Sequence, residues 1–399
     1  MIKINGKKLI LIHDKKRAES ILNYRDTASL MGLGAATENV ILKAHQMGFE
    51  VQMKMFPLGF PHDVYADFEF EETAPSTELE ERRMIDAVAD ALELAMQKHG
   101  NLILLGQDIA EYGGVFKATD GLVQKYGKSR VRNTPLCEAA IVGTSLGLSI
   151  NGFKAMMEMQ FADFVSSGFN PIVNNLAKLH YRWGQNADVV VRMPCGAGVG
   201  AGPFHSQTNE AWFTHTPGLK VVYPAFPTDA KGLLAASIED PNPVMFFEHK
   251  GLYRSVKEDV PDDYYTLELG KASLIKEGND VTIVTYGMGV HWALETLAEN
   301  PEIAADLIDL RSLQPLDTEA ILNSVKKTGR AIILQEDSLF GGIASDISSM
   351  IMEQCFEYLD APVKRVASID TPIPFINQLE EQYLPKNRFE SELKSLLAY

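Results

Sequence analysis

Short apolar runs alternate with helical stripes along most of this 399-residue chain, and no other feature constrains its fold as strongly. Residues 101–105 (NLILL) and 188–192 (DVVVR) contain unbroken runs of four and three apolar residues, which are too short for helices. Between residues 83 and 99, by contrast, apolar side chains recur at helical spacing. Continuous apolar strands that alternate with helices are typical of parallel sheets buried on both faces. The sequence therefore predicts an α/β fold with mostly parallel sheets covered by helices on both faces.

The chain divides into three zones. Residues 1–77 form an N-terminal extension of unknown role, and its acidic end at residues 67–72 is interpreted as a linker or solvated arm. An acidic, proline-containing break at residues 257–263 separates a second zone, residues 78–256, from a third, residues 268–399. Because both later zones alternate strands with helices, we expect a larger α/β domain followed by a smaller one.

Periodicity assigns individual elements within these zones. In the first zone, residues 31–53 are expected to be helical and then extended. Helices are expected at residues 83–99, 138–150, 164–181, 228–238, 291–298, 318–326 and 342–353. Strands are expected at residues 101–105, 154–159, 188–192, 221–223, 244–247, 281–286, 304–308, 331–334 and 363–366.

The balance of charges excludes several kinds of partner. Lys and Arg together number 37 against 53 Asp and Glu, so the net charge is −16 at pH 7. A chain this acidic repels polyphosphates, and we expect neither nucleic acid nor an anionic membrane as a partner. The three cysteines are scattered and imply neither a disulfide framework nor a zinc site, which favours a reducing compartment.

No stretch of the sequence suggests export or membrane insertion. Eighteen consecutive apolar residues occur nowhere, and residues 3–8 are polar and basic where a signal peptide would be apolar. We therefore expect a cytoplasmic protein, or one of the mitochondrial matrix if the source is eukaryotic, although no transit peptide is evident.

Two glycine-containing stretches resemble nucleotide-binding motifs but differ in their details. In residues 121–129 five residues separate the glycines where a phosphate loop requires four, so we expect a helix that ends at Gly127. Residues 196–201 follow a strand, as a dinucleotide fingerprint does, but Pro194 and Pro203 flank them where that motif needs a helix. We interpret this second stretch as a flexible loop beside a site.

Three positions could carry chemistry. Glu138 begins a predicted helix, where a carboxylate either stabilises the helix N-terminus or exchanges protons in an apolar cleft. Phe164 follows Phe161 at the head of a helix and is either a core residue or a flat face for a heterocycle. His205 ends a glycine- and alanine-rich stretch and is either structural or catalytic. Its neighbour Ser206 lacks the Gly-x-Ser-x-Gly elbow of a serine nucleophile.

These positions belong to a series of longer stretches that carry a resemblance to a known family. The stretches are LGQDIAEYGG (105–114), TPLCEAAIVG (134–143), MQFADF (159–164), HSQ (205–207), PGLKVV (217–222), FEHKGLYR (247–254), DLRSLQPLD (309–317) and Glu336 with Gly341 and Gly342. Residues 83–399 resemble the β subunit of the thiamine-diphosphate-dependent 2-oxo acid dehydrogenases, the decarboxylating component of the pyruvate and branched-chain 2-oxo acid complexes. The resemblance leaves residues 1–77 unexplained.

The resemblance implies a fold and a set of partners. It implies a transketolase-like pyrimidine-binding domain at residues 78–256 and a transketolase C-terminal-like domain at residues 268–399. Thiamine diphosphate would be shared with an α subunit that holds Mg²⁺ through a Gly-Asp-Gly motif, and this motif is absent from the sequence. Two α and two β chains would assemble, and the acyl product would pass to the lipoyl group of an acyltransferase core.

The same resemblance implies roles for individual residues. Glu138 would hydrogen-bond a ring nitrogen of the aminopyrimidine and favour the tautomer that activates the cofactor. Phe164 would stack on the pyrimidine, with Leu136 and Gln160 nearby. His205 would assist proton transfer or transfer of the acyl group to lipoamide.

Proteins of this family often bind an alkali cation such as K⁺ as well. The matching positions are Val189, Ser237, Asp240 and Asn242. Residues 240–243 (DPNP) are equally typical of a plain turn, so both interpretations stay open.

The substrate is less constrained than the reaction. FEHKGLYR is closer to the branched-chain type, so the expected substrate is a branched-chain 2-oxo acid such as 3-methyl-2-oxobutanoate. A pyruvate dehydrogenase β subunit is an alternative, because one methylene changes binding by only about 1–3 kcal/mol. A non-catalytic assembly scaffold of the same fold is a second alternative, whereas the missing Gly-Asp-Gly motif disfavours a transketolase complete in one chain.

Overall fold

A computed structural model gives the structure of the chain. It describes the backbone of residues 2–5, 8–12, 49–55 and 64–72 and the whole of residues 79–399. The chain consists of two compact units, Met1–Glu78 and Leu79–Tyr399. Each unit is described by itself below.

The described residues of the first unit form an antiparallel sheet. Its strands, in the order β1-β2-β4-β3, are β1 (Ile2–Asn5), β2 (Lys8–Ile12), β4 (Val64–Glu72) and β3 (Phe49–Met55). The linker predicted at residues 67–72 is wrong, because β4 pairs with both β2 and β3 there. Acidic residues alternate with Phe68 and Phe70, a strand pattern hidden by the charge. The extended part predicted within residues 31–53 is confirmed in β3, and the helical part lies outside the described residues.

The larger sheet of the second unit has seven strands in the order β16-β10-β11-β9-β8-β6-β7. Its strands are β6 (Leu102–Gly106), β7 (Val131–Asn133), β8 (Lys154–Glu158), β9 (Val189–Cys195), β10 (Lys220–Val222), β11 (Val244–His249) and β16 (Ser312–Gln314). All neighbouring strands are parallel except the β10–β16 pair. The prediction of a mostly parallel sheet is therefore confirmed.

Consecutive side chains along a strand of this sheet belong to two different hydrophobic cores, one on each face, which explains the continuous apolar runs. In β6, Ile103 and Leu105 belong to one core, whereas Leu102 and Leu104 belong to the other. Helices cover both faces, with α3 (Met84–Lys98) and α8 (Pro227–Glu239) on one face and α5 (Glu138–Ile150) and α6 (Ala177–Trp183) on the other.

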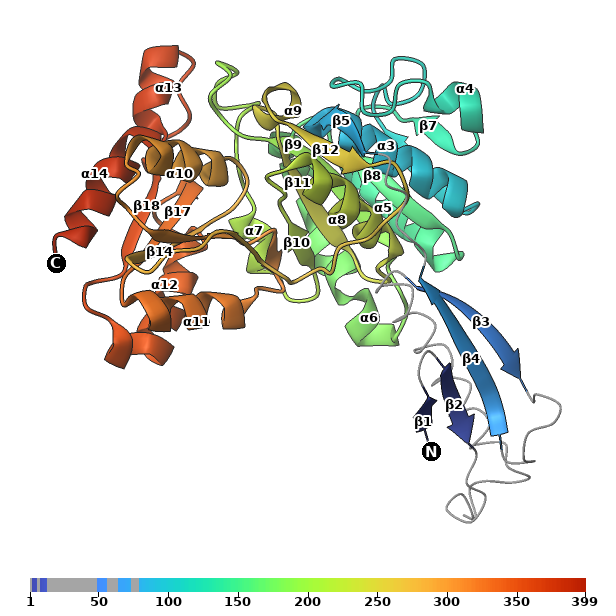
Figure 1. Cartoon of the computed structure of the whole chain (residues 1–399). Coiled ribbons are helices and arrows are strands. Elements are labelled where there is room, and N and C mark those ends of the chain that lie inside the picture. Colours follow the sequence, from blue (N-terminus) through green and yellow to red (C-terminus); the bar gives the residue numbers. More distant parts are fainter. Residues whose placement is uncertain (1, 6–7, 13–48, 56–63, 73–78) are drawn as a thin grey trace. The chain divides into compact units, whose positions relative to one another are not determined.

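The second sheet has five strands in the order β13-β15-β14-β17-β18, and only the β13–β15 pair is antiparallel. Its strands are β13 (Ser273–Lys276), β14 (Val281–Thr285), β15 (Ala305–Asp309), β17 (Ala331–Ser338) and β18 (Lys364–Ser368). Figure 1 shows its covering helices on two sides, α10 (Met288–Glu299) and α14 (Lys386–Leu397) opposite α11 (Thr318–Thr328) and α12 (Ala344–Cys355). Strand β16 lies between β15 and α11 in the sequence but pairs with β10 of the seven-stranded sheet. This pairing joins the five-stranded part of the unit to the seven-stranded part.

Several predicted elements differ from the structure. Lys257–Pro261 is not an irregular break but strand β12, which pairs antiparallel with β5 (Leu79–Arg83). The single helix predicted at residues 164–181 is three consecutive segments: a 3₁₀ helix η2 (Ala162–Gly168), a π helix η3 (Pro171–Leu176) and α6. Further short helices are α4 (Leu122–Tyr126), α7 (Ala211–Thr214), α9 (Leu252–Ser255), η4 (Phe356–Tyr358) and α13 (Asn377–Tyr383).

The two glycine-containing stretches that resemble nucleotide-binding motifs have the backbone conformations that the sequence predicts. Gly127 ends α4 with a φ of 77°, a left-handed conformation that favours glycine. Residues 196–201 form a loop after β9, with no helix at their end. Within the described part of the chain, no helix has the length and apolar character needed to span a bilayer.

Candidate active site

The candidate site lies at the carboxyl ends of three adjacent parallel strands, β6, β8 and β9. Gln107 follows β6, Gln160 follows β8, and the loop of residues 196–207 follows β9. Loops converge at this edge of an open α/β sheet, which makes it the usual place for a ligand.

Glu138 is the first residue of α5, and its side chain is buried with 6% exposure. Its Oε1 accepts a hydrogen bond of 3.0 Å from Nε2 of the buried Gln107. A carboxylate at a helix N-terminus is also favoured by the helix dipole. The side chain is therefore fixed in one orientation inside the site, whether or not it exchanges protons there.

Three rings meet beside this position. The His205 ring lies edge-on to Phe161, with centroids 4.9 Å apart, and edge-on to Phe164 at 5.5 Å. Phe161 and Phe164 are themselves 5.6 Å apart, and all three rings are only partly buried. Phe164 lies on η2, which packs against α5 so closely that a Cβ on Gly168 would lie 3.6 Å from the carbonyl carbon of Glu138. The structure thus brings Glu138, Phe164 and His205 into one region.

Asp108 connects two of the predicted residues through the end of β6. Nε2 of Gln160 donates to Oδ2 of Asp108 at 3.2 Å, and Asp108 directly follows the Gln107 that bonds Glu138. Asp108 has a φ of 58°, a left-handed backbone that is rare for residues other than glycine. Leu136 is 78% exposed, so it offers an uncovered apolar surface next to Glu138.

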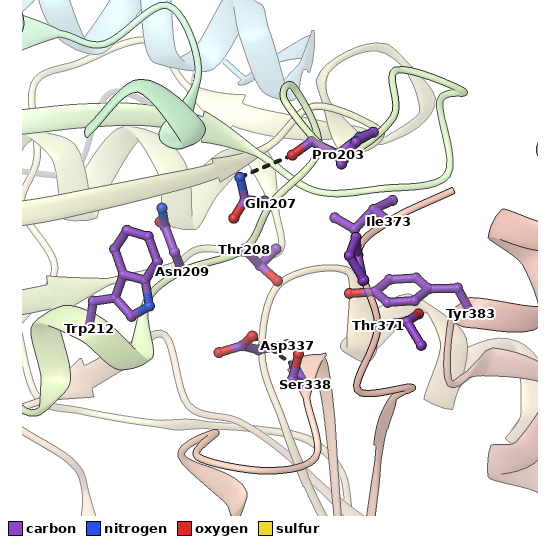
Figure 2. Close-up of a pocket in the computed structure, with 11 residues that line it drawn as sticks. Pro203, Gln207, Thr208, Asn209, Trp212, Asp337, Ser338, Thr371, Ile373 and Tyr383 are labelled. Atoms are coloured by element: carbon purple, nitrogen blue, oxygen red, sulfur yellow. Dashed lines mark hydrogen bonds between the residues drawn. The ribbon is translucent and has the colours of Figure 1, made fainter. Parts of the chain in front are cut away.

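Asp163 fixes the far end of the loop that carries His205. Its Oδ1 accepts from the backbone N–H of Gln207 at 3.2 Å and from the Gln207 Nε2 at 2.9 Å. Its Oδ2 is buried and has no partner among the residues that the structure describes. Gln207 Nε2 also donates to the Pro203 carbonyl at 3.1 Å, as Figure 2 shows.

A pocket of about 320 Å³ lies between this loop and the second sheet. Figure 2 shows its lining: Pro203, Gln207, Thr208, Asn209 and Trp212 from the first part of the unit, and Asp337, Ser338, Thr371, Pro372, Ile373 and Tyr383 from the second. Burial raises the pKa of Asp337 to about 6, against the backbone hydrogen bond that it accepts from Ser338 and with the help of the nearby Glu336 carboxylate. The pocket contains none of Glu138, Phe164 and His205, so we do not assign it to the proposed cofactor.

The four positions matched to an alkali cation lie in one neighbourhood. The N–H of Ala187 donates to the Pro241 carbonyl at 3.0 Å, which places the start of β9 beside the turn after α8. In that turn Asp240 Oδ1 accepts from the backbone and side-chain nitrogens of Asn242 at 2.9 and 3.0 Å, an Asx turn. Its other oxygen bonds the ammonium of Lys220. The turn is thus present, and the cation remains a prediction.

Ser237, the last of these positions, uses its hydroxyl within its own helix. Its Oγ donates to the carbonyl of Leu233 at 2.7 Å. Among the residues described, no group of three or more His, Cys, Asp and Glu side chains could hold a metal ion.

The sequence analysis assigned no individual role to four residues of this region, Gln107, Asp108, Asp163 and Gln207, although all four lie in the stretches that carry the resemblance. Gln107 and Asp108 come directly after a buried strand, and the rule that ligands bind at the carboxyl ends of parallel strands could have identified them. No local signal marks the Asp163–Gln207 pair, since 44 positions separate its members.

Comparison with known proteins identifies the family. Residues 80–256 match the pyrimidine binding domain of transketolase, and residues 270–388 match the transketolase C-terminal domain. The 2-oxoisovalerate dehydrogenase subunit beta of Bacillus subtilis (strain 168) is 42% identical over 321 residues, which cover 79% of this chain and 98% of that protein. The chain belongs to the family of 2-oxo acid dehydrogenase β subunits.

Other β subunits are similarly close. The mitochondrial 2-oxoisovalerate dehydrogenase subunit beta of Dictyostelium discoideum is 44% identical over 81% of this chain and 90% of its own length. The pyruvate dehydrogenase E1 component subunit beta of Bacillus subtilis (strain 168) is 43% identical over 76% of this chain and 95% of its own. A solved split gene transketolase, described as an inactive beta4 tetramer, superposes with a TM-score of 0.66 at 25% identity, over 79% of this chain and 99% of that one. The predicted family and fold are therefore confirmed.

Proposed function

We propose that this β subunit takes part in the thiamine-diphosphate-dependent oxidative decarboxylation of a branched-chain 2-oxo acid such as 3-methyl-2-oxobutanoate. The observation that carries the proposal is the buried carboxylate of Glu138, fixed by Gln107 beside the partly exposed ring of Phe164. Relatives named 2-oxoisovalerate dehydrogenase β subunits, at 42–44% identity, support the branched-chain substrate. The intact site argues against a non-catalytic scaffold.

The residues present fit the pyrimidine half of the cofactor. Glu138 would share a proton with a ring nitrogen, and Gln107 would keep the carboxylate turned toward it. Phe164 would offer its ring face, while Leu136 and Gln160 would border the pyrimidine. When bound, thiamine diphosphate supplies the electron sink that decarboxylation requires.

His205 would hold or move a proton at its imidazole during transfer of the acyl group to a lipoyl group. Its ring packs on Phe161 and Phe164, so it lies at the border of the proposed pyrimidine pocket. We expect His205→Ala to lower acyl transfer by about 10²-fold, the usual contribution of a general acid or base, and to leave cofactor affinity within about threefold. A collapse of cofactor affinity with unchanged acyl transfer per bound cofactor would make His205 structural.

An α subunit would complete the site. The sequence has no Gly-Asp-Gly motif, and a diphosphate needs a divalent cation with oxygen ligands. We therefore propose that the α subunit holds Mg²⁺ and the diphosphate, that two α and two β chains assemble, and that a lipoyl acyltransferase core accepts the product. Stacking and one hydrogen bond alone correspond to about millimolar affinity. Calorimetric titration of thiamine diphosphate and Mg²⁺ tests this, and micromolar binding without an α chain contradicts it.

The substrate is tested on the assembled enzyme. The panel contains 3-methyl-2-oxobutanoate, pyruvate and acetoin, because a β subunit of an acetoin:2,6-dichlorophenolindophenol oxidoreductase is also 44% identical to this chain. We expect the highest kcat/KM for the branched-chain acid. Higher values for pyruvate or acetoin would reassign the substrate, and the absence of any turnover would favour the scaffold.

Two further proposals concern a cation and the compartment. Val189, Ser237, Asp240 and Asn242 would bind K⁺, and replacing K⁺ by N-methylglucamine should then lower the Tm of wild type but not of Asn242→Ala. An equal loss of Tm in wild type and in Asn242→Ala would contradict the K⁺ site. We also propose that the protein works in the cytoplasm, or in the mitochondrial matrix of a eukaryote, in line with its mitochondrial relatives.

A further inference from the structure

The loop of residues 196–207, which carries His205, contacts the C-terminal domain. The N–H of Ala197 donates to Glu336 Oε1 at 2.6 Å, and the N–H of Gly200 donates to Glu380 Oε2 at 2.9 Å. A Cβ on Gly202 would lie 2.4 Å from the ring of Phe375, so the backbone touches that ring directly. Side chains that follow residue 330 in the sequence thus hold a loop of the pyrimidine-binding domain.

Glu336 is surrounded by donors on both of its oxygens. It is 6% exposed on β17, and its Oε2 lies 2.7 Å from Nε2 of His249. Nδ1 of His249 accepts from the N–H of Gly251 at 3.0 Å, so the ring proton sits on Nε2 and points at Glu336. The carboxylate therefore accepts from Ala197 and from His249 together. A glutamine amide could accept only one of these two bonds.

The first residue of the loop belongs to the same cluster. Gly196 has a φ of 97°, and a Cβ there would lie 2.1 Å from Nε2 of His249. Its carbonyl accepts from Nζ of the buried Lys250 at 2.6 Å. The start of the loop, the imidazole of His249 and the carboxylate of Glu336 are thus in direct contact.

We propose that Glu336 is a positioning residue that fixes the start of the loop and thereby the place of His205 against Phe161 and Phe164. Glu380 is a second and weaker anchor in the middle of the loop, and Asp163 holds its far end. The C-terminal domain then shapes the site without contributing a group to the reaction. The effect on acyl transfer rests on the proposed function of His205, but the anchorage of the loop does not.

The experiment compares Glu336→Gln and Glu380→Gln in the full chain with Glu392→Gln as a matched control. Glu392 belongs to the same domain and pairs with Lys364 on the surface. Hydrogen–deuterium exchange is measured on peptides from residues 196–205 and from strand β14. We expect exchange at Ala197 to rise about tenfold in Glu336→Gln, since one bond to a charged acceptor is lost, with less change in Glu380→Gln. The control and β14 should match wild type.

The second measurement uses the enzyme assembled with an α chain. We expect Glu336→Gln to lower kcat for acyl transfer about tenfold and to change cofactor affinity less than about threefold. Unchanged loop exchange in Glu336→Gln would overturn the inference. So would faster exchange throughout the C-terminal domain, or a loosened loop with unchanged acyl transfer while His205→Ala abolishes that transfer. If His205→Ala itself keeps full acyl transfer, the proposed function of His205 fails, and loop exchange still decides whether Glu336 anchors the loop.

Discussion

The two mostly parallel sheets of residues 79–399 use the carboxyl ends of their strands in different ways. In the first sheet these ends carry Gln107 and the loop of residues 196–207, which belong to the candidate site. In the second sheet Tyr286 and Arg311 follow β14 and β15, and Glu336 lies near the end of β17. These three residues bond the first domain instead. One architecture thus supplies a reaction site in one domain and a support for that site in the other.

The bonds between the domains are specific. Tyr286 donates its hydroxyl to Glu210 at 2.6 Å, and Arg311 bonds both oxygens of Asp229 at 2.7 and 2.9 Å. The comparison teaches that a polar residue at the carboxyl end of a parallel strand marks a functional edge without saying whether it binds a ligand or another domain.

Glu158 and Glu248 of the first sheet differ from Asp309 of the second in whether a cation pairs with the buried carboxyl group. In the first sheet Arg192 is 1% exposed and bonds Glu158 at 2.7 Å and Glu248 at 2.6 Å. In the second sheet Asp309 is fully buried, and its Oδ2 has no partner among the described residues. Burial and the nearby charge of Asp229 raise the pKa of Asp309 to about 8.

Removal of Arg192 should have the largest effect on stability. Arg192→Met leaves Glu158 and Glu248 buried without their cation, and we expect the free energy of unfolding to fall by about 3–5 kcal/mol. Arg311→Met is the matched variant between the domains. Because Arg311 is 22% exposed, we expect a loss of only about 1–2 kcal/mol. Urea denaturation of the full chain measures both, and equal losses would remove the contrast between the sheets.

The second-largest effect should be on enzymatic activity, which we expect to depend on residues at the first sheet. Glu138→Gln should lower turnover in the assembled enzyme about 10²–10³-fold, because an amide cannot exchange the proton, while Tm stays within about 2 °C. NMR of proton exchange at the cofactor's thiazolium ring reports the same step. Asp309→Asn serves as the control from the second sheet and should keep wild-type turnover. Wild-type exchange in Glu138→Gln would refute the role of Glu138.

The contrast between the sheets also explains what the sequence could predict. Helix α5 was predicted with both of its bounds, because its apolar composition and the break after Ile150 are local. Strands β5 and β12 escaped prediction, since each is mostly polar and the pairing joins Leu79 to Pro261. Strand β16 escaped it as well, because it has only three residues and pairs with β10 of the other domain.

The residues of the candidate site show the same difference between those that could be predicted from the sequence and those that could not. Glu138, Phe164 and His205 were identified from stretches that resemble a known family, and the structure gathers them in one region. Gln107 and Glu336 also lie in those stretches, but their orienting roles were not predicted. The bond of Gln107 to Glu138 spans 31 positions, and that of Glu336 to Ala197 spans 139. Periodicity reports burial and element type but carries no information on such distant pairs.

The buried Asp309 of the second sheet makes stability depend on pH. The pKa of Asp309 is about 8 in the folded chain, against an ordinary value of 3.8. Between these values the folded chain binds a proton at Asp309 that the unfolded chain has lost, so the contribution of Asp309 to stability falls as the pH rises. Relative to wild type, Asp309→Asn should gain at most about 1.4 kcal/mol per pH unit from pH 4 to 8. Thermal unfolding at several pH values measures this gain, with the exposed Asp360→Asn as control, and parallel curves for Asp309→Asn and wild type would contradict it.

The smallest effect should come from the hydrogen bond between the domains at Tyr286. Burial, followed by the nearby Asp337 charge, raises the pKa of Glu210 well above its usual range, so the tyrosine hydroxyl donates to an acid that is easily protonated. A typical hydrogen bond contributes about 1 kcal/mol, and we expect Tyr286→Phe to lower the free energy of unfolding by that amount. Tyr181→Phe, at a side chain that is 95% exposed, should change nothing. A loss as large as that of Arg192→Met would contradict this expectation and show that the contact between the domains depends on a buried charge.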